Sequence, residues 1–160
     1  MAVRVQLEDF DIGAEVRGVA AGNTDVGAIV TFTGTVRGEA KGQPIATMTL
    51  EHYPGMTEDE LARVEAEALA RWPLAGTLII HRYGALRPGD NIVLVVTASR
   101  HRQAAFEAAE FLMDYLKSRA PFWKKEADAS GAGSWVDARD ADLDAMQRWA
   151  QNPSTRRAQP

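Results

Sequence analysis

A nearly unbroken apolar run at residues 91–99, NIVLVVTAS, constrains the fold more than any other stretch of the chain. A short run that is rich in β-branched residues is typical of a strand buried on both faces. Residues 77–83 form a second strand pattern, and the Pro88-Gly89 pair between the two runs suits a tight turn. We therefore predict an antiparallel hairpin at the centre of a sheet.

Hydrophobic spacing predicts the elements around this hairpin. Apolar residues alternate in strands expected at residues 3–7, 28–37 and 45–52, and a last short strand is expected at 134–139. They recur at helical spacing in helices expected at 12–20, 57–72, 100–119 and 140–149. In the strand at 28–37, Val30 and Phe32 are expected on the apolar face. The chain therefore mixes strands and helices along its whole length.

Two of these helices carry more specific signals. Thr57 and Glu60 have the T-x-x-E spacing of a capping box, which predicts the start of the second helix. In the third helix, the expected apolar stripe is Phe106, Ala109, Met113 and Leu116. Pro121 disfavours a helical conformation at the residue before it, so this helix is expected to end near Arg119.

Four cations fall within nine positions where the third helix ends. They are Lys117, Arg119, Lys124 and Lys125. The whole chain has a formal net charge of −4, so this local excess of positive charge marks a candidate site on the last turn of the helix and on a turn after it. The helix dipole alone would favour Lys117 at this position. Alternatively, the neighbouring cations lower the pKa of its ammonium toward that of a useful acid, base or nucleophile.

Other residues offer contacts for an anion or a flat ligand. His101 and Arg102 lie in the first turn of the third helix, where free backbone N–H groups favour negative charge. Arg37 leaves its strand on the polar face, just before a loop. The alternatives are that His101 only covers the start of the helix and that Arg102 and Arg37 are solvent-exposed. Phe122 and Trp123 either stack on a heterocycle or pack internally.

The composition excludes several mechanisms. Without cysteine the chain has no thiol nucleophile, so any sulfur that it handles must come from another molecule. His52, His81 and His101 lack the spacing of metal ligands, and we expect neither a metal centre nor a bound cofactor. The acidic balance argues against nucleic acid as a partner. No apolar run approaches about 20 residues and no secretory signal is evident, so we expect no membrane contact and a cytoplasmic location.

Six segments together resemble the catalytic large subunit of molybdopterin synthase. In chain order they are VTFTGTVR, TLEHYPGMTE, RWPL, IIHRYGALRPGD, SRHRQAAFEAAEFLMDYLKSRAPFWKKE and SWVDAR. The resemblance runs from about residue 27 to residue 149. It implies an α+β fold of the α/β-hammerhead type with an additional antiparallel sheet. A single domain is expected over residues 1–150, with a flexible tail at 151–160.

The resemblance implies a sulfurtransferase of molybdenum cofactor biosynthesis, which converts cyclic pyranopterin monophosphate into molybdopterin by installing a dithiolene. The sulfur would arrive as a thiocarboxylate on the C-terminal Gly-Gly tail of a small ubiquitin-like subunit. Two large subunits would form a homodimer with one small subunit at each end, giving a heterotetramer. Two alternatives use the same cations: a non-catalytic module that binds such a tail or an anionic ligand, and a Schiff-base lyase that uses Lys117.

Residue roles are carried over from the family where this sequence matches its motifs. The catalytic lysines match Lys117 and Lys124. The substrate-binding positions match Thr35, Val36, Arg37, His101, Arg102, Lys117, Lys124, Lys125 and Glu126. The cations are expected to hold the phosphate and to stabilise developing negative charge, with Lys117 toward the carbonyl of the tail and Lys124 toward the pterin. The loop at residues 38–43 departs from the family pattern, so no role is transferred to it.

Overall fold

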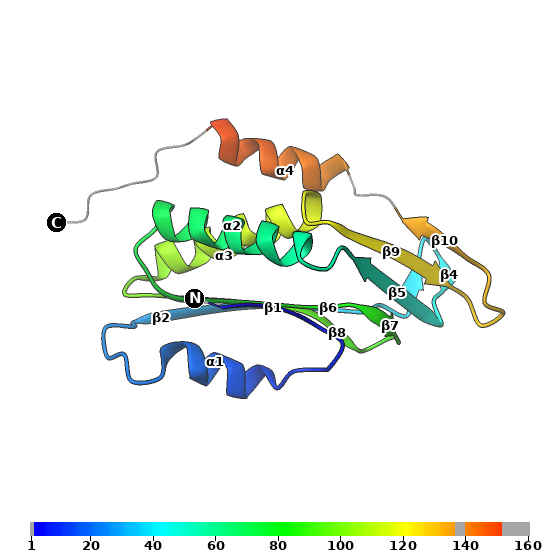
Figure 1. The fold of residues 1–160 in the computed structure, drawn as a ribbon, viewed down its shortest axis with the longest axis horizontal. Helices are drawn as coiled ribbons and strands as arrows, with labels where there is room; N and C mark the ends of the chain where they lie inside the picture. The colour runs from blue at the N-terminus through cyan, green and yellow to red at the C-terminus, as the bar shows by residue number, and fades with distance from the viewer. Residues whose placement is uncertain (1, 137–139, 152–160) are drawn as a thin grey trace.

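A four-stranded sheet with helices on both faces forms the larger part of the molecule (Figure 1). The computed structural model describes residues 2–136 and 140–151. In spatial order the strands are β1 (Val3–Gln6), β6 (Leu74–Arg82), β8 (Asn91–Ser99) and β2 (Ala28–Thr35). β6 pairs antiparallel with β8 in the middle of this sheet, which confirms the predicted central hairpin.

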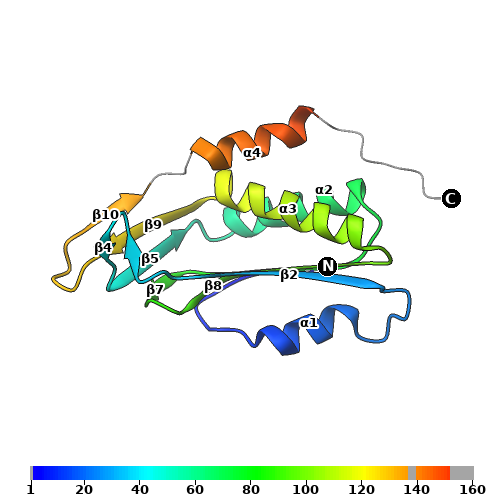
Figure 2. The same ribbon diagram turned by 180° about the vertical axis from the view of Figure 1, so that it is seen from behind.

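Helices cover both faces of the sheet (Figure 1 and Figure 2). α1 (Ile12–Ala20) lies on one face, α2 (Met56–Arg71) and α3 (Arg102–Ser118) lie on the other, and α4 (Asp140–Gln151) packs over α3. None of the described helices is long and apolar enough to cross a membrane. The predicted tail at 151–160 begins at the last residue of α4 and otherwise falls outside the described residues.

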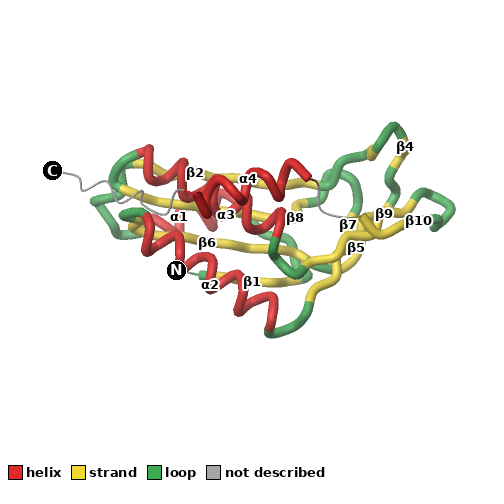
Figure 3. The backbone as a smooth tube through the Cα atoms, turned by 90° about the horizontal axis from the view of Figure 1, so that it is seen from above, coloured by secondary structure: helices red, strands yellow, loops and turns green. Residues whose placement is uncertain are grey.

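A second sheet extends beyond one end of the helices (Figure 3). Its antiparallel strands are, in order, β10 (Gly133–Val136), β9 (Phe122–Ala127), β5 (Thr47–His52) and β7 (Gly84–Leu86). A small hairpin of β3 (Glu39–Ala40) and β4 (Gln43–Pro44) lies beside it. The additional antiparallel sheet is therefore confirmed. The chain turns at residues 119–121 as predicted, but Lys124 and Lys125, which were predicted on this turn, lie on β9, which pairs with β5 along its whole length.

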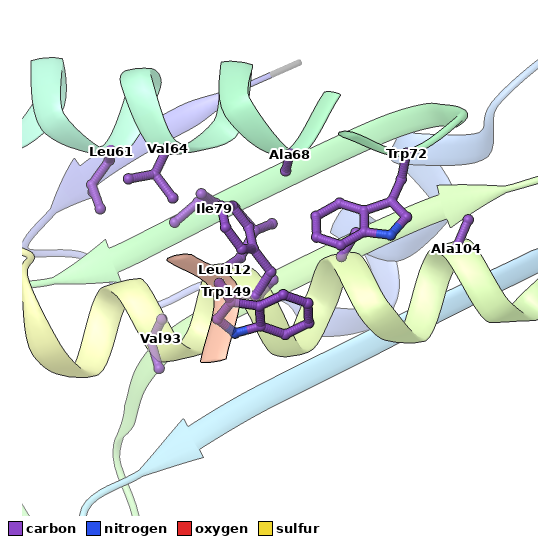
Figure 4. Packing of buried hydrophobic residues seen from close by; sticks show 12 residues of the cluster. Leu61, Val64, Ala68, Trp72, Ile79, Val93, Ala104, Leu112 and Trp149 are labelled. Carbon is purple, nitrogen blue, oxygen red and sulfur yellow. The ribbon is translucent and has the colours of Figure 1, made fainter. Parts of the chain in front are cut away.

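The side chains of Trp72, Phe111 and Trp149 pack together in the core between α2, α3 and α4. Figure 4 shows the two indoles. Phe111 is fully buried, and its ring centroid lies 5.2 Å from that of Trp72 and 5.5 Å from that of Trp149. The indole N–H of Trp72 donates to Glu107 over 2.8 Å, and that of Trp149 donates to Asp114 over 2.6 Å. Both indoles thus bury their rings while their polar atoms are satisfied.

The predicted apolar stripe of α3 is partly correct. Ala109 is buried, and Met113 and Leu116 are partly buried against the same core, but Phe106 is 61% exposed. The buried residues of the helix are Ala104, Ala105, Ala108, Ala109, Phe111 and Leu112. The physical reason is that a row of alanines lets α3 lie close to β8 and to α2, so the small residues define the contact face.

The start of α2 also differs from its prediction. Gly55 is the N-cap, and its backbone N–H donates to the Glu58 carboxylate over 2.7 Å. The predicted capping box of Thr57 and Glu60 is therefore wrong. The Thr57 hydroxyl is buried and donates to the carbonyl of Pro121 over 3.2 Å. This side chain joins the start of α2 to the start of β9 instead of capping a helix.

Candidate functional site

The C-terminal end of α3 leads directly into β9, so the predicted cation cluster lies on two elements (Figure 1). Lys117 is an exposed residue in the last turn of α3. Arg119 ends the helix, and its backbone N–H donates to the Tyr115 carbonyl over 2.8 Å. Lys124 and Lys125 follow on β9. The two lysines predicted to be catalytic are thus held by different elements that meet at one end of the molecule.

Lys124 and Lys125 lie on opposite faces of β9, because successive side chains of a strand alternate. Lys124 pairs with Leu50 of β5 and Glu126 pairs with Met48, and both of these β5 residues are buried. The Lys124 side chain is 34% exposed, and its Nζ lies 3.3 Å from Glu126 Oε1. Lys125 is exposed on the other face. Lys124 and Glu126 therefore form an ion pair on the inner face of the second sheet.

A buried imidazole, that of His81, lies where the two sheets meet. Its ring stacks on Phe122 with a centroid distance of 3.7 Å and an interplanar angle of 18°. His81 Nδ1 lies 2.8 Å from the carbonyl oxygen of Arg82. Since a carbonyl only accepts, Nδ1 carries the proton and Nε2 keeps its lone pair in the neutral ring. Burial, with smaller contributions from the charges of Lys117 and His52, lowers the pKa of His81 to about 4.

This low pKa predicts a pH dependence of stability. The unfolded chain binds a proton on His81 near the ordinary pKa of about 6.5, before the folded protein does, so acid favours unfolding. We expect His81 alone to lower the free energy of unfolding by about 3 kcal/mol as the pH falls from about 6.5 to about 4. Urea denaturation across this range measures the loss. His81→Gln should lack this part of the slope, and an unchanged slope in the variant would contradict the assignment.

The end of β2 lies at the same end of the main sheet. A register shift follows Gly34, after which Thr35 pairs with Asn91 at the start of β8. Val36 is 4% exposed and packs with the buried residues of the second sheet, whereas Thr35 and Arg37 are exposed. The structure therefore places Thr35 and Arg37 on the surface near the junction of the two sheets, and Val36 in the core beneath them.

Two predicted anion contacts lie far from this junction. His101 is the exposed N-cap of α3 and Arg102 is its exposed first residue. Lys117 lies in the last turn of the same helix, which has 17 residues. At a rise of 1.5 Å per residue, about 25 Å separates the two ends. A single chain thus does not bring His101 and Arg102 together with Lys117.

The remaining aromatic residues that the sequence singled out differ in burial. Phe122 packs on His81, whereas Trp123 is 41% exposed on the outer face and contacts Tyr53 edge-on at 4.5 Å. Phe32, predicted on an apolar face, is 39% exposed because β2 is an edge strand.

Sequence reasoning missed His81, which it considered only as a metal ligand. Its place at the end of a buried strand was the available signal.

These features define a class: an α+β protein in which one lysine lies at the end of a helix and a second lies on the following strand, within a second antiparallel sheet. Residues 5–119 match the family model described as MoaE protein. The chain therefore belongs to the MoaE family, and the resemblance found in the sequence is confirmed. The expected hammerhead-type fold is confirmed with it.

Relatives and solved structures agree with this membership. The molybdopterin synthase catalytic subunit of Mesorhizobium japonicum is 57% identical over 148 residues, which cover 92% of each chain. The protein of the same name from Pseudomonas aeruginosa is 54% identical and covers 93% of this chain and 99% of its own. A molybdopterin biosynthesis MoaE protein from Burkholderia ambifaria superposes with a TM-score of 0.78 at 50% identity, covering 92% and 97%. Molybdopterin synthase from Staphylococcus aureus gives 0.76 at 32% identity, covering 83% and 95%.

Proposed function

We propose that this protein is the sulfurtransferase that forms the dithiolene of molybdopterin. It takes sulfur from the C-terminal thiocarboxylate of a small ubiquitin-like subunit and delivers it to cyclic pyranopterin monophosphate. The observation that carries the proposal is the identity of 57%, over nearly the whole chain, with a molybdopterin synthase catalytic subunit. The absence of cysteine from the sequence fits a reaction in which the sulfur is imported on a partner.

The two lysines have separate duties in this proposal. Lys117, exposed at the end of α3, meets the terminal carbonyl of the partner's tail and moves protons there. Lys124, paired with Glu126 on the inner face of β9, faces the pterin and stabilises negative charge as the cyclic phosphate opens. Each sulfur that leaves the tail is replaced by a water oxygen, so the tail ends as a carboxylate.

The phosphate contacts fit an assembly of two large subunits. Arg37 and Thr35 lie at the same end of the molecule as Lys117. His101 and Arg102 lie about 25 Å away, at the other end of α3. If all of these residues serve one substrate, the last two must come from a second copy. The separation thus supports the homodimer within the proposed heterotetramer. The expected cytoplasmic location remains part of the proposal.

The two adjacent lysines of β9 give a test of the site. Lys124→Ala is expected to reduce turnover by roughly 10- to 100-fold, because it removes a charge-assisted contact and leaves Glu126 without its partner. Lys125→Ala is expected to lose less, since its side chain lies on the outer face of the sheet. Initial rates of dithiolene formation measure both variants. A larger loss in Lys125→Ala would contradict the assignment of the inner face to the substrate.

A single reconstitution separates the proposal from its rivals. The purified protein is mixed with the pterin precursor and the thiocarboxylated partner. Dithiolene product supports the proposed reaction, whereas a stable complex without product favours a non-catalytic binding module. Addition of borohydride tests the Schiff-base alternative, which requires a trapped adduct on Lys117 with a carbonyl substrate.

A further inference from the structure

The outer edge of β2 lacks the features that protect an exposed sheet edge. β2 is the last strand of the main sheet and, within the described part of the chain, pairs only with β8. Its eight residues, AIVTFTGT, include no charged residue and no proline, and its irregularity lies at its end, after Gly34. Natural sheets protect exposed edges with charges, prolines, bulges or short strands, because unpaired backbone groups bind other strands. A long edge without this protection is typical of a strand that is paired in the assembly.

The opposite edge of the same sheet is protected. β1 has only four residues, and its Arg4 forms an ion pair with Glu15 of α1. β2 instead exposes apolar side chains on both faces, with Phe32 39% and Ile29 40% exposed. Phe32 pairs with Val95 of the core that α3 covers, and Ile29 lies on the other face because side chains alternate. The two edges therefore differ in length, charge and polarity.

We propose that β2 pairs antiparallel with β2 of a second copy of this chain, about a two-fold axis near Thr31 and Phe32. A second copy suits this edge because two identical strands joined about such an axis form a closed contact and leave no free edge between them. The two four-stranded sheets then form one continuous sheet. The apolar side chains that flank the edge in one copy meet those of the other.

The length of β2 supports a second copy as the occupant. From Ala28 to Thr35 the strand spans about 23 Å at about 3.3 Å per residue. This is close to the roughly 25 Å between the two ends of α3, which contacts β2. His101 lies near the start of β2, since Ser99 pairs with Ala28 and its hydroxyl accepts from the His101 backbone N–H over 3.4 Å. Antiparallel pairing therefore brings the start of β2 in one copy beside its end in the other.

This pairing supplies the residues that a single chain leaves apart. His101 and Arg102 of one copy come beside the end of β2 in the other, where Arg37 follows the strand. Lys117 lies at that same end of the second copy. The interface does not depend on the reaction, whereas the site composed from two copies rests on the proposed function. The two can therefore be tested separately.

Cross-linking tests the interface, because the chain has no cysteine of its own. Thr31→Cys places a thiol on an exposed residue beside the axis. The control, Ala62→Cys, places one on an exposed residue of α2, which contacts β1 at the opposite edge. We expect a short bifunctional thiol reagent to convert most of the Thr31→Cys protein, but not the Ala62→Cys protein, into a covalent dimer. Equal cross-linking of both variants, or none in Thr31→Cys, would overturn the proposal.

A charge at the same position tests the strength of the contact. Thr31→Lys sets two like charges against each other near the axis and adds the protection that this edge lacks. We expect the Kd of the dimer to rise by roughly 10-fold or more, and by less than about twofold in Ala62→Lys. Analytical ultracentrifugation measures both. A monomeric wild-type protein, or a Kd that Thr31→Lys leaves unchanged, would overturn the proposal. A wild-type edge that is covered only when the ubiquitin-like partner is added would also overturn it.

Mixing two damaged variants tests the composite site. Arg37→Ala and Arg102→Ala each impair both sites of their own dimer, whereas a mixed dimer keeps one site with both arginines. After subunit exchange in equal amounts, half of the dimers are mixed, so we expect about one quarter of the wild-type rate of dithiolene formation. Mixed dimers no more active than their parents would overturn the composite site. A wild-type protein that dimerises through β2 yet makes no dithiolene would contradict the proposed function alone.

Discussion

Lys117→Ala is expected to lower the rate of dithiolene formation by at least about 100-fold while the protein stays folded. The side chain is exposed in the last turn of α3, so its removal takes little from the core. Its interaction with the helix dipole contributes only about 0.3–1 kcal/mol to stability. The large effect on rate therefore comes from the chemistry at the tail carbonyl, measured as turnover with a thiocarboxylated partner and the pterin precursor.

The matched control is Arg17→Ala, which removes an exposed cation from the last turn of α1. It carries the same dipole effect but lies on the opposite face of the main sheet from α3. We expect turnover within about twofold of wild type and a comparable small change in stability. Near-normal turnover in Lys117→Ala would contradict its catalytic role and leave it as a cation that caps a helix.

Phe111→Ala is expected to lower the free energy of unfolding by about 3–5 kcal/mol, the largest stability effect that we predict. Its ring is fully buried and contacts the rings of Trp72 and Trp149. Its centroid also lies 4.8 Å from that of Tyr115. An alanine here would leave a cavity between three helices, and α4 would lose part of the surface against which it packs. Urea denaturation gives the difference.

Phe106→Ala is the control on the same helix. The two phenylalanines are alike in chemistry, but Phe106 is 61% exposed. Its replacement should change the free energy of unfolding by about 0.5 kcal/mol or less. If both variants lost equal stability, Phe106 would belong to the core as the sequence predicts, and its exposed position on α3 would be wrong.

The main sheet and its helices could be predicted because their periodicity is strong. The run at β8 is almost entirely apolar, and Asp11, an amino acid that favours the N-cap, precedes α1 and accepts from the Ala14 backbone N–H over 2.9 Å. The segment of β9 was misread for a physical reason. FWKKEA carries two adjacent lysines and little β-branching, so its strand conformation depends on pairing with β5.

The candidate site was only partly predictable. The local excess of positive charge located Lys117 and Lys124. The sequence does not distinguish Lys124 from Lys125, because only the strand conformation of β9 places their side chains on opposite faces. His101 and Arg102 were grouped with them by resemblance, although a straight helix of 17 residues separates them from Lys117. His81 was missed because its importance depends on burial and on its neighbours, which spacing along the chain does not reveal.

Mass spectrometry of the complete reaction tests the central claim most directly. The protein is incubated with cyclic pyranopterin monophosphate and the thiocarboxylated partner. The masses of the pterin and of the partner are measured over time. We predict that the pterin gains two sulfur atoms in steps while each consumed tail exchanges one sulfur for oxygen. A tail that keeps its sulfur and a pterin of unchanged mass, in a complex that nevertheless forms, would contradict the claim that this protein is the sulfurtransferase.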